Sequence, residues 1–267
     1  MKNSNMDYKL IKYSIEQKVA LIKFNRPGVL NSFNKQMAKE FQNALKDARE
    51  DKEVRSILIT GEGKAFSAGQ DLAEAIPKDR PLADVGEIVR ESYNPIILLI
   101  REIEKPIVCA VNGIAAGAGA NIALACDIVV ASEIAPFLQA FSKIGLIPDS
   151  SGTFFLPRIV GLQRASAMMM LAEKISAEEA LKYGMIYKIF PEEILFEEAR
   201  KLAVYLSTQP TKGFGLTKRA LNKSFSNDLN SQLNLEEELQ IEASKTYDYQ
   251  EGVKAFLEKR NPDFKGE

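Results

Sequence analysis

The chain has no histidine and no tryptophan in 267 residues, and it has only two cysteines. Without histidine, neither a Ser-His-Asp nor a Cys-His catalytic arrangement can form, and most transition-metal sites lose their commonest ligand. Cys109 and Cys126 stand in separate apolar segments, which predicts buried core thiols rather than a metal or redox pair. Any chemistry must therefore come from other groups.

Long hydrophobic runs and an excess of either charge are also missing. The apolar runs, such as those at 107–111 and 128–131, are too short to cross a bilayer, and residues 1–5 lack the apolar stretch of a signal peptide. The charges of the 35 basic and 36 acidic residues nearly cancel. The sequence has no basic stripe with interleaved aromatic side chains, which is the pattern typical of nucleic-acid binding. We therefore expect a cytoplasmic protein that binds neither membranes nor nucleic acids.

Strand and helix signals alternate along the first part of the chain. Short apolar, β-branched runs predict strands at 19–24, 54–59, 107–111 and 128–131. Apolar spacing predicts helices at 34–50, 85–104 and 117–125, with Pro95 at a kink or break in the second of them. This alternation is typical of an α/β fold with a mostly parallel sheet, whose ligand loops lie at the carboxyl ends of strands.

Beyond residue 150 the pattern becomes helical. Ser176 and Glu179 form a capping box that predicts a helix ending near Gly184. Further helices are predicted at 192–207, 211–224, 231–246 and 248–260. We expect an α/β core over residues 1–200 that carries the site, and a helical module over 201–267. Since this module lacks a core of its own, it should pack on the α/β core or on another subunit.

Two glycine-rich loops, at 65–72 and 112–119, are the most informative feature of the chain. Small residues let backbone N–H groups approach a ligand closely, and two converging N–H donors can stabilise an enolate or a tetrahedral oxyanion. The alternative is that Gly117 and Gly119 merely allow tight helix packing. A nucleotide site fits poorly, because the second loop lacks the third glycine of a dinucleotide fingerprint and neither loop has the Lys-Ser/Thr ending of a phosphate loop.

Asp149 follows a proline and precedes small polar residues, which leaves two interpretations open. As a helix N-cap, its carboxylate would accept backbone N–H bonds that favour ionisation. In an apolar pocket lined by Phe137, Phe141 and Ile147, desolvation would instead raise its pKa and make it a better general base.

Several ordered motifs resemble the enoyl-CoA hydratase/isomerase (crotonase) superfamily along nearly the whole chain. The matching segments are residues 25–27 with 30–32, 65–72, 105–127, 141–149 with 152–153, 156–158, and the tail at 251–260. The resemblance implies a crotonase-like spiral of ββα units with a C-terminal helical trimerisation module. It also implies an acyl-CoA thioester substrate, no separate cofactor or metal, and a homotrimer or dimer of trimers.

The same resemblance assigns roles to individual residues. It places the oxyanion hole at the backbone N–H groups of Gln70 and Ala118. It implies that the segment with Ala68, Asp71 and Leu72 holds the adenine end of coenzyme A. Lys259 would meet the coenzyme A phosphates, across a subunit boundary.

The carboxylates distinguish the reactions of the superfamily. Its hydratases use two glutamates, but the matching positions here are Asn121 and Phe141. Water addition normally needs one group to activate water and another to deliver a proton, so simple hydration is disfavoured. Asp149 stands where isomerases of the superfamily carry their carboxylate, and one carboxylate suffices to remove a proton and return it elsewhere.

Within the superfamily the chain is most similar to isomerases of phenylacetate degradation, which convert ring-1,2-epoxyphenylacetyl-CoA into oxepin-CoA. Residues 93–95, 110–120 and 140–149 carry this similarity. Tyr93 would line the acyl pocket or, equally, be a partly exposed helix residue. One departure is Ser151, where the family usually has glycine; its side chain could narrow the loop or hydrogen-bond Asp149.

We therefore expect an acyl-CoA isomerase that works through a thioester enolate, with 1,2-epoxyphenylacetyl-CoA as the expected substrate. One alternative is an enoyl-CoA hydratase of fatty-acid β-oxidation, in which Asp149 acts with a water held by Asn121. The other is a non-catalytic acyl-CoA-binding protein.

Overall fold

The computed structural model describes residues 8–75 and 83–267, so the N-terminal stretch at 1–5 considered above lies outside the described residues. Ten strands are described: β1 (Ile11–Glu16), β2 (Val19–Phe24), β3 (Ser56–Gly61), β4 (Ala65–Ser67), β5 (Ile107–Val111), β6 (Ile114–Ala116), β7 (Ile128–Ser132), β8 (Phe137–Leu138), β9 (Lys174–Ile175) and β10 (Lys188–Phe190).

The helices are α1 (Lys35–Glu50), α2 (Leu72–Ala75), α3 (Val85–Ile88), α4 (Asn94–Glu102), α5 (Ala118–Ala125), α6 (Gly152–Val160), α7 (Leu162–Leu171), α8 (Ala177–Lys182), α9 (Glu192–Ser207), α10 (Thr211–Ser224), α11 (Leu229–Ala243) and α12 (Tyr247–Glu258). A π-helical turn, Val89–Tyr93, joins α3 to α4, and short 3₁₀ turns occupy Pro27–Val29 and Ala140–Ile144.

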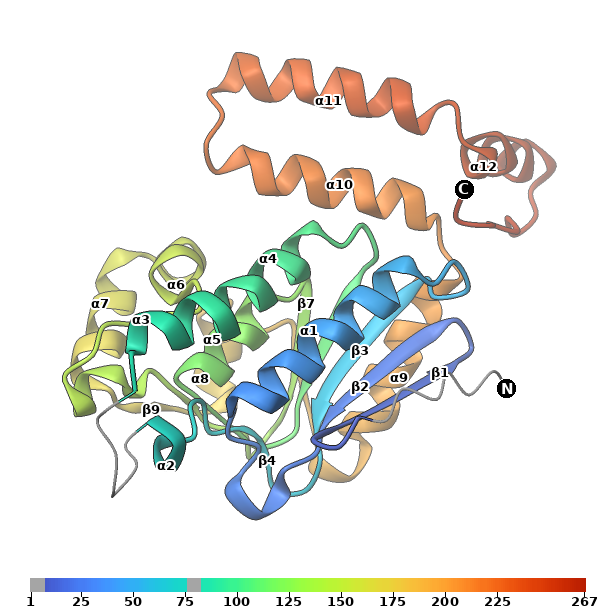
Figure 1. The fold of residues 1–267 in the computed structure, drawn as a ribbon. Helices are drawn as coiled ribbons and strands as arrows, with labels where there is room; N and C mark the ends of the chain where they lie inside the picture. Colours follow the sequence, from blue (N-terminus) through green and yellow to red (C-terminus); the bar gives the residue numbers. More distant parts are fainter. Residues whose placement is uncertain (1–7, 76–82) are drawn as a thin grey trace.

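The strands form two sheets that the chain visits alternately. One has the order β1-β2-β3-β5-β7-β10 and the other β4-β6-β8-β9. The pairs β3/β4, β5/β6 and β7/β8 each contribute one strand to each sheet, and helices follow each pair, so the chain winds as a spiral of ββα units (Figure 1). Because β4, β6 and β8 are parallel neighbours, their carboxyl ends meet at one edge. This edge carries the segments with Gln70, Ala118 and Asp149.

Helices cover both faces of the larger sheet. Leu58, Val108 and Val130 face α9, whereas their strand neighbours Ile57 and Ile59 face the core that also contains α1, α4 and α5. This alternation follows from the two-residue period of a strand, and burial on both faces explains why these strands read as continuous apolar runs. Cys109 and Cys126 are free and buried, which confirms their prediction as core thiols.

Most predicted elements are confirmed, including the helices at 192–207 and 211–224 and the capping box of α8. Pro95 lies in the first turn of α4, just after the π-helical turn, as a break requires. The prediction was wrong for the starts of the two glycine loops, since Ala65–Ser67 and Ile114–Ala116 are strands of the second sheet. Three residues are too few to show a strand period.

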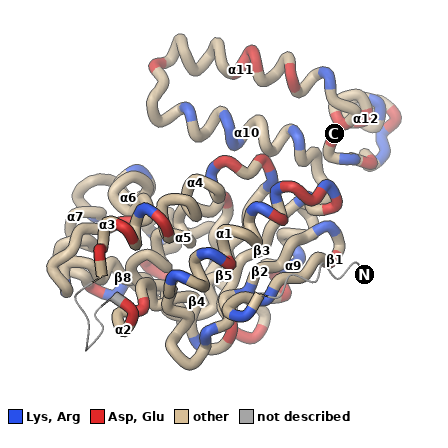
Figure 2. The backbone as a smooth tube through the Cα atoms, in the orientation of Figure 1, with Lys and Arg blue, Asp and Glu red and all other residues tan. Residues whose placement is uncertain are grey.

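The last three helices extend away from the α/β core (Figure 1). Lys212 and Arg219 of α10 pair with Glu104, which follows α4, and Figure 2 shows this basic helix beside the acidic end of α4. The apolar side chains of α12 are mostly exposed, with Phe256 at 83% and Leu257 at 74%. The boundary at residue 200 stays a prediction, and α9 runs through it unbroken.

Within residues 8–75 and 83–267, no helix combines the length and the apolar character needed to cross a membrane.

Candidate active site

The two glycine loops meet, and the Gln70 N–H points into the space between them. Phe33 pairs with Gln70 as a parallel bridge, in which Phe33 donates to the Gly69 carbonyl at 2.7 Å and accepts from Asp71 N–H at 2.8 Å. In such a bridge the N–H of the central residue points to the opposite side, so the Gln70 N–H faces away from Phe33. A Cβ built on Gly69, which has φ +87°, would lie 3.4 Å from the Ala118 nitrogen.

The second donor is the first residue of α5. Ala118 follows Gly117, which has φ +53°, and the first intrahelical bond is donated by Asn121 to the Gly117 carbonyl. The Ala118 N–H is therefore one of the unpaired donors at a helix N-terminus, where the helix dipole adds a partial positive charge. The Ala118 nitrogen thus lies beside Gly69 across the gap between the two loops, an arrangement that would suit two N–H donors for a developing oxyanion.

Close packing of α5 on β4 holds this gap. A Cβ on Gly119 would lie 2.6 Å from the Ser67 carbonyl oxygen, so only glycine lets the helix approach the strand this closely. The packing interpretation of the second loop is therefore correct for Gly119. The close packing at Gly119 does not exclude a role of the same loop in presenting backbone N–H groups to a ligand.

Asp149 is not a helix cap. Helix α6 begins with Ser151 at its N-cap, without a capping side-chain bond, and the Asp149 carboxylate accepts a bond from the Ser150 hydroxyl at 2.8 Å. Burial raises the pKa of Asp149 above its ordinary value, and the hydrogen bond from Ser150 opposes this rise only partly. Of the two interpretations left open by the sequence, the desolvated carboxylate is the correct one.

The predicted lining of the Asp149 pocket needs one correction. Ile147 is 81% exposed, because it lies in the extended segment after the left-handed Gly145, so it does not line a buried pocket. Ser150 and Ser151 both have left-handed backbone, with φ 49° and 63°, a region that favours glycine. The Ser151 hydroxyl donates to the Ser150 carbonyl, so Ser150 rather than Ser151 hydrogen-bonds Asp149.

Asn121 fastens the Asp149 loop to α5. Its Nδ2 donates to the Asp149 backbone carbonyl at 2.8 Å, and its Oδ1 accepts from Gln139 Nε2 at 2.7 Å. A Cβ on Gly152 would lie 2.4 Å from the same Nδ2, so α6 begins directly against this amide. Sequence reasoning missed Gln139 and Ser150, since a buried amide or a loop hydroxyl gives no pattern in a single sequence.

Replacing Asn121 with alanine should lower the free energy of unfolding by about 1–3 kcal/mol for each buried polar group left without a partner. Gln139, itself buried, would lose its acceptor, whereas the Asp149 carbonyl would lose one of its two donors and keep the Gly152 N–H. Urea denaturation measures the effect, with Asn230→Ala on the exposed surface of α11 as the control. Equal stability of the two variants would contradict a fastening role.

Phe141 occupies the other position where the hydratases carry a glutamate. It is buried, and its ring would lie 3.7 Å from a Cβ on Gly117. The side chains beside the Ala118 donor are therefore an amide and an aromatic ring. Asp149 is joined to this edge of the fold through the bond from Asn121 to its backbone carbonyl.

Tyr93 is 1% exposed, so the alternative of a partly exposed helix residue is wrong. Its hydroxyl donates to Gln70 Oε1 at 2.7 Å. Burial, and then the charge of Asp149, raise the pKa of Tyr93 well above its ordinary value, so its hydroxyl remains a neutral donor. Tyr93 thus lies within electrostatic range of Asp149.

The residues predicted to hold coenzyme A lie in different places. Ala68 donates its N–H to the Leu30 carbonyl, and Leu72 begins α2 with its side chain 45% exposed. The Asp71 carboxylate pairs with Arg26 at 2.9 Å and accepts from Ala73 N–H, so it holds the loop in place. Lys259 is exposed at the end of α12, far from α5 and α6 of the same chain (Figure 1).

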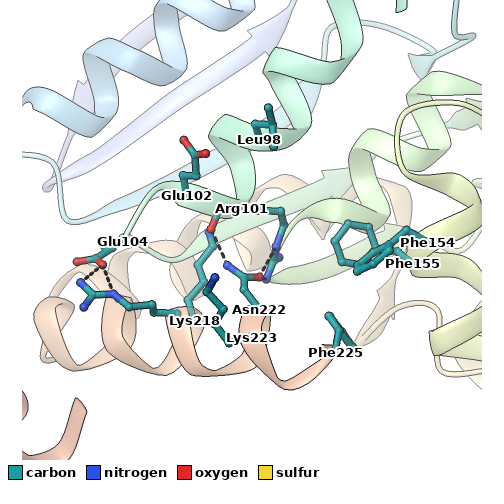
Figure 3. A pocket seen from close by; sticks show the side chains of 12 residues that line it. Leu98, Arg101, Glu102, Glu104, Phe154, Phe155, Lys218, Asn222, Lys223 and Phe225 are labelled. Carbon is teal, nitrogen blue, oxygen red and sulfur yellow. Dashed lines mark hydrogen bonds and ion pairs between the residues drawn. The ribbon is translucent and has the colours of Figure 1, made fainter. Parts of the chain in front are cut away.

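A separate cavity of about 430 Å³ lies between α4, α6 and α10 (Figure 3). Its polar groups are paired with one another. Arg101 bonds Asn222 in both directions, and the buried Lys218 pairs with Asp127 at 2.8 Å. None of the predicted site residues lines this cavity. We therefore regard it as part of the attachment of α10.

Comparison with known proteins agrees with the fold. Residues 14–267 match the family described as enoyl-CoA hydratase/isomerase. The chain is 46% identical to the 1,2-epoxyphenylacetyl-CoA isomerase of Escherichia coli K12, over 94% of this chain and 97% of the relative. It is 44% identical to a Rhodobacter capsulatus protein named "Probable enoyl-CoA hydratase", over 98% and 100%.

Solved structures agree with these relatives. The crystal structure of an enoyl-CoA hydratase from Bacillus anthracis superposes with a TM-score of 0.90 at 31% identity, and the match covers 97% of this chain and 100% of that one. The chain belongs to the enoyl-CoA hydratase/isomerase family and has the crotonase fold. It is an enzyme of the class that isomerises or hydrates acyl-CoA thioesters.

Proposed function

We propose that the protein is an acyl-CoA isomerase with Asp149 as its only acid/base and the Gln70 and Ala118 N–H groups as its oxyanion hole. One observation carries the proposal. A desolvated carboxylate is joined through Asn121 to the helix whose first N–H is a free donor, while both glutamate positions of the hydratases hold other side chains.

The proposed reaction has three steps. The thioester carbonyl oxygen accepts bonds from Gln70 N–H and Ala118 N–H, which lowers the energy of the enolate. Asp149 takes a proton from the carbon next to that carbonyl, and the electron pair of the broken C–H bond delocalises onto the oxygen. Asp149 then returns the proton to a different carbon. Substrate and product are isomers, so no water, metal or redox cofactor is needed, and coenzyme A remains part of the substrate.

The proposed substrate is 1,2-epoxyphenylacetyl-CoA, rearranged to oxepin-CoA in phenylacetate degradation, with the cytoplasm as the expected compartment. In this substrate the ring carbon–carbon bond bridged by the epoxide oxygen also opens, and its electron pair enters the double bonds of the seven-membered ring, so substrate and product remain isomers. Support comes from the name of the Escherichia coli relative at 46% identity. The buried aromatic residues near the gap, Tyr93 and Phe141, are compatible with a ring-bearing acyl group.

A hydratase is the second candidate, favoured by the name of the 44% identical relative. In that case Asp149 would act with a water held by Asn121. The amide of Asn121 already donates to the Asp149 carbonyl and accepts from Gln139, which leaves it little capacity to orient a water.

A panel of three thioesters tests the two candidates. The protein is incubated separately with 1,2-epoxyphenylacetyl-CoA, a 3-enoyl-CoA and a 2-enoyl-CoA, and products are followed by mass spectrometry. We expect products of unchanged mass from the first two substrates. Rapid gain of 18 mass units from the 2-enoyl-CoA, which is one water, with no isomer from the other two, would replace the proposal with a hydratase.

We also propose that the protein assembles as a trimer or dimer of trimers through its C-terminal helices. The support is the exposed apolar surface of α12, with Phe256 and Leu257 foremost. Phe256→Asp should yield smaller species in analytical ultracentrifugation and weaken coenzyme A binding, if Lys259 reaches a neighbouring site. Tyr205→Asp, at a 60% exposed position on α9, is the control. An unchanged sedimentation coefficient for Phe256→Asp would exclude this interface.

A further inference from the structure

The π-helical turn Val89–Tyr93 is held open by a side chain from α1. A π-helical turn contains an extra residue and frees carbonyl groups from the regular helical pattern. Gln42, which is 4% exposed, donates its Nε2 to the Glu91 carbonyl at 2.8 Å and to the Ser92 carbonyl at 3.1 Å. The two bonds from Gln42 therefore stabilise the π-helical turn, whose last residue is Tyr93.

Tyr93 and Phe33 together hold Gln70 from two sides. The ring of Tyr93 packs on that of Phe33, with centroids 6.1 Å apart, and its hydroxyl donates to Gln70 Oε1. Phe33 bonds the backbone on either side of Gln70. The Gln70 amide also donates to the Asp71 carbonyl at 3.3 Å. Both the side chain and the backbone of Gln70 are thus fixed, and the direction of its N–H follows from them.

We infer that Tyr93 is a positioning residue that aims the Gln70 N–H at the substrate carbonyl, and that the π-helical turn places its hydroxyl for this purpose. The inference deepens the proposed function and rests on its oxyanion hole alone. The Tyr93 hydroxyl bonds Gln70 rather than the acyl group. Its loss should therefore affect enolate formation more than substrate binding.

Tyr93→Phe removes the hydroxyl and keeps the ring. We expect kcat to fall by about 10-fold, below the 10²–10³-fold loss typical when a whole oxyanion donor is removed. KM should change by less than about 2-fold, since an interaction made chiefly in the transition state acts on kcat. Gln70→Met, which keeps the backbone N–H but removes the acceptor, should give a similar loss. The double variant should be no worse than Gln70→Met alone, because Gln70→Met already removes the contact with Tyr93.

Tyr13→Phe is the matched control. Tyr13 is another tyrosine whose hydroxyl oxygen is buried, and among the described residues that oxygen has no hydrogen-bond partner. This substitution should leave kcat unchanged. Additive losses in the Tyr93 and Gln70 variants would overturn the inference, as would a loss confined to KM. A shifted acid limb of the pH profile in Tyr93→Phe would instead show that Tyr93 acts on Asp149.

The test separates this inference from the proposed function. Enolate stabilisation serves both isomerisation and hydration, so the Tyr93 effect can be measured with whichever acyl-CoA reaction the wild type catalyses. If Asp149→Asn retains isomerase activity while Tyr93→Phe loses it as described, the proposed base is wrong and the positioning role stands.

Discussion

Asp149→Asn should lower kcat for isomerisation by about 10²–10⁴-fold, the usual contribution of a positioned general base. Asparagine has nearly the same shape but cannot take up the proton. The backbone carbonyl that accepts the Asn121 bond is unchanged, so the loop should keep its place. Steady-state kinetics measures the loss, and binding of the substrate thioester by isothermal calorimetry is the control. Activity near that of the wild type would show that Asp149 is not the base.

The raised pKa of Asp149 predicts how the activity and the stability of the wild type depend on pH. Because the base must be ionised, kcat/KM of the wild type should fall as pH falls through that raised pKa, at a higher pH than for an exposed aspartate. The folded state holds this proton more tightly than the unfolded state, so the carboxylate's contribution to stability is lost as pH rises through the same window. Asp149→Asn should therefore unfold at a higher temperature than the wild type at neutral pH. A lower melting temperature would contradict the desolvated environment.

Gly119→Ala should lower kcat by about 10²-fold, as displacement of catalytic groups by about 1 Å often does. The new methyl group would lie 2.6 Å from the Ser67 carbonyl, so α5 must move away from β4 and carry the Ala118 N–H away from Gln70. Circular dichroism checks that the variant folds. Gly28→Ala, where the structure leaves the new methyl group free of neighbours within 4 Å, is the control and should retain full activity.

Gly69→Ala provides a second test of the same gap from its other side. Its Cβ would lie 2.8 Å from the Ala116 carbonyl, and its left-handed backbone disfavours alanine.

A folded Gly119→Ala protein with wild-type kcat would show that the spacing of the two N–H groups does not limit the reaction.

Much of the fold follows from patterns within single elements. The buried parallel strands, such as β5, read as apolar runs because both of their faces are covered. Helices such as α1 show their apolar face at the correct spacing. Strands β4 and β6 were missed because three residues are too few to show a period, and Gly119 allows α5 to pack closely on β4.

The sequence predicted the backbone segments of the candidate site, but not the side chains that support these segments. The glycine loops predicted converging N–H donors, the family resemblance assigned these donors to Gln70 and Ala118, and the structure brings the two segments together. The environment of Asp149 depends on burial by distant segments, so the sequence left its pKa open in both directions. The contacts of Asn121 with Gln139 and of Tyr93 with Gln70 join different turns of the spiral, which no local pattern records.

The most direct test of a one-carboxylate isomerase follows a 3-enoyl-CoA in D₂O by mass spectrometry and NMR, with wild type and Asp149→Asn in parallel. We expect the wild type to move the double bond without adding water, and the Asp149→Asn protein to leave the substrate unchanged. Deuterium uptake should be low, because a proton held on a partly buried carboxylate exchanges more slowly with solvent than one on an exposed carboxylate. Isomerisation at equal rates by both proteins, or water addition by the wild type in place of isomerisation, would contradict the account.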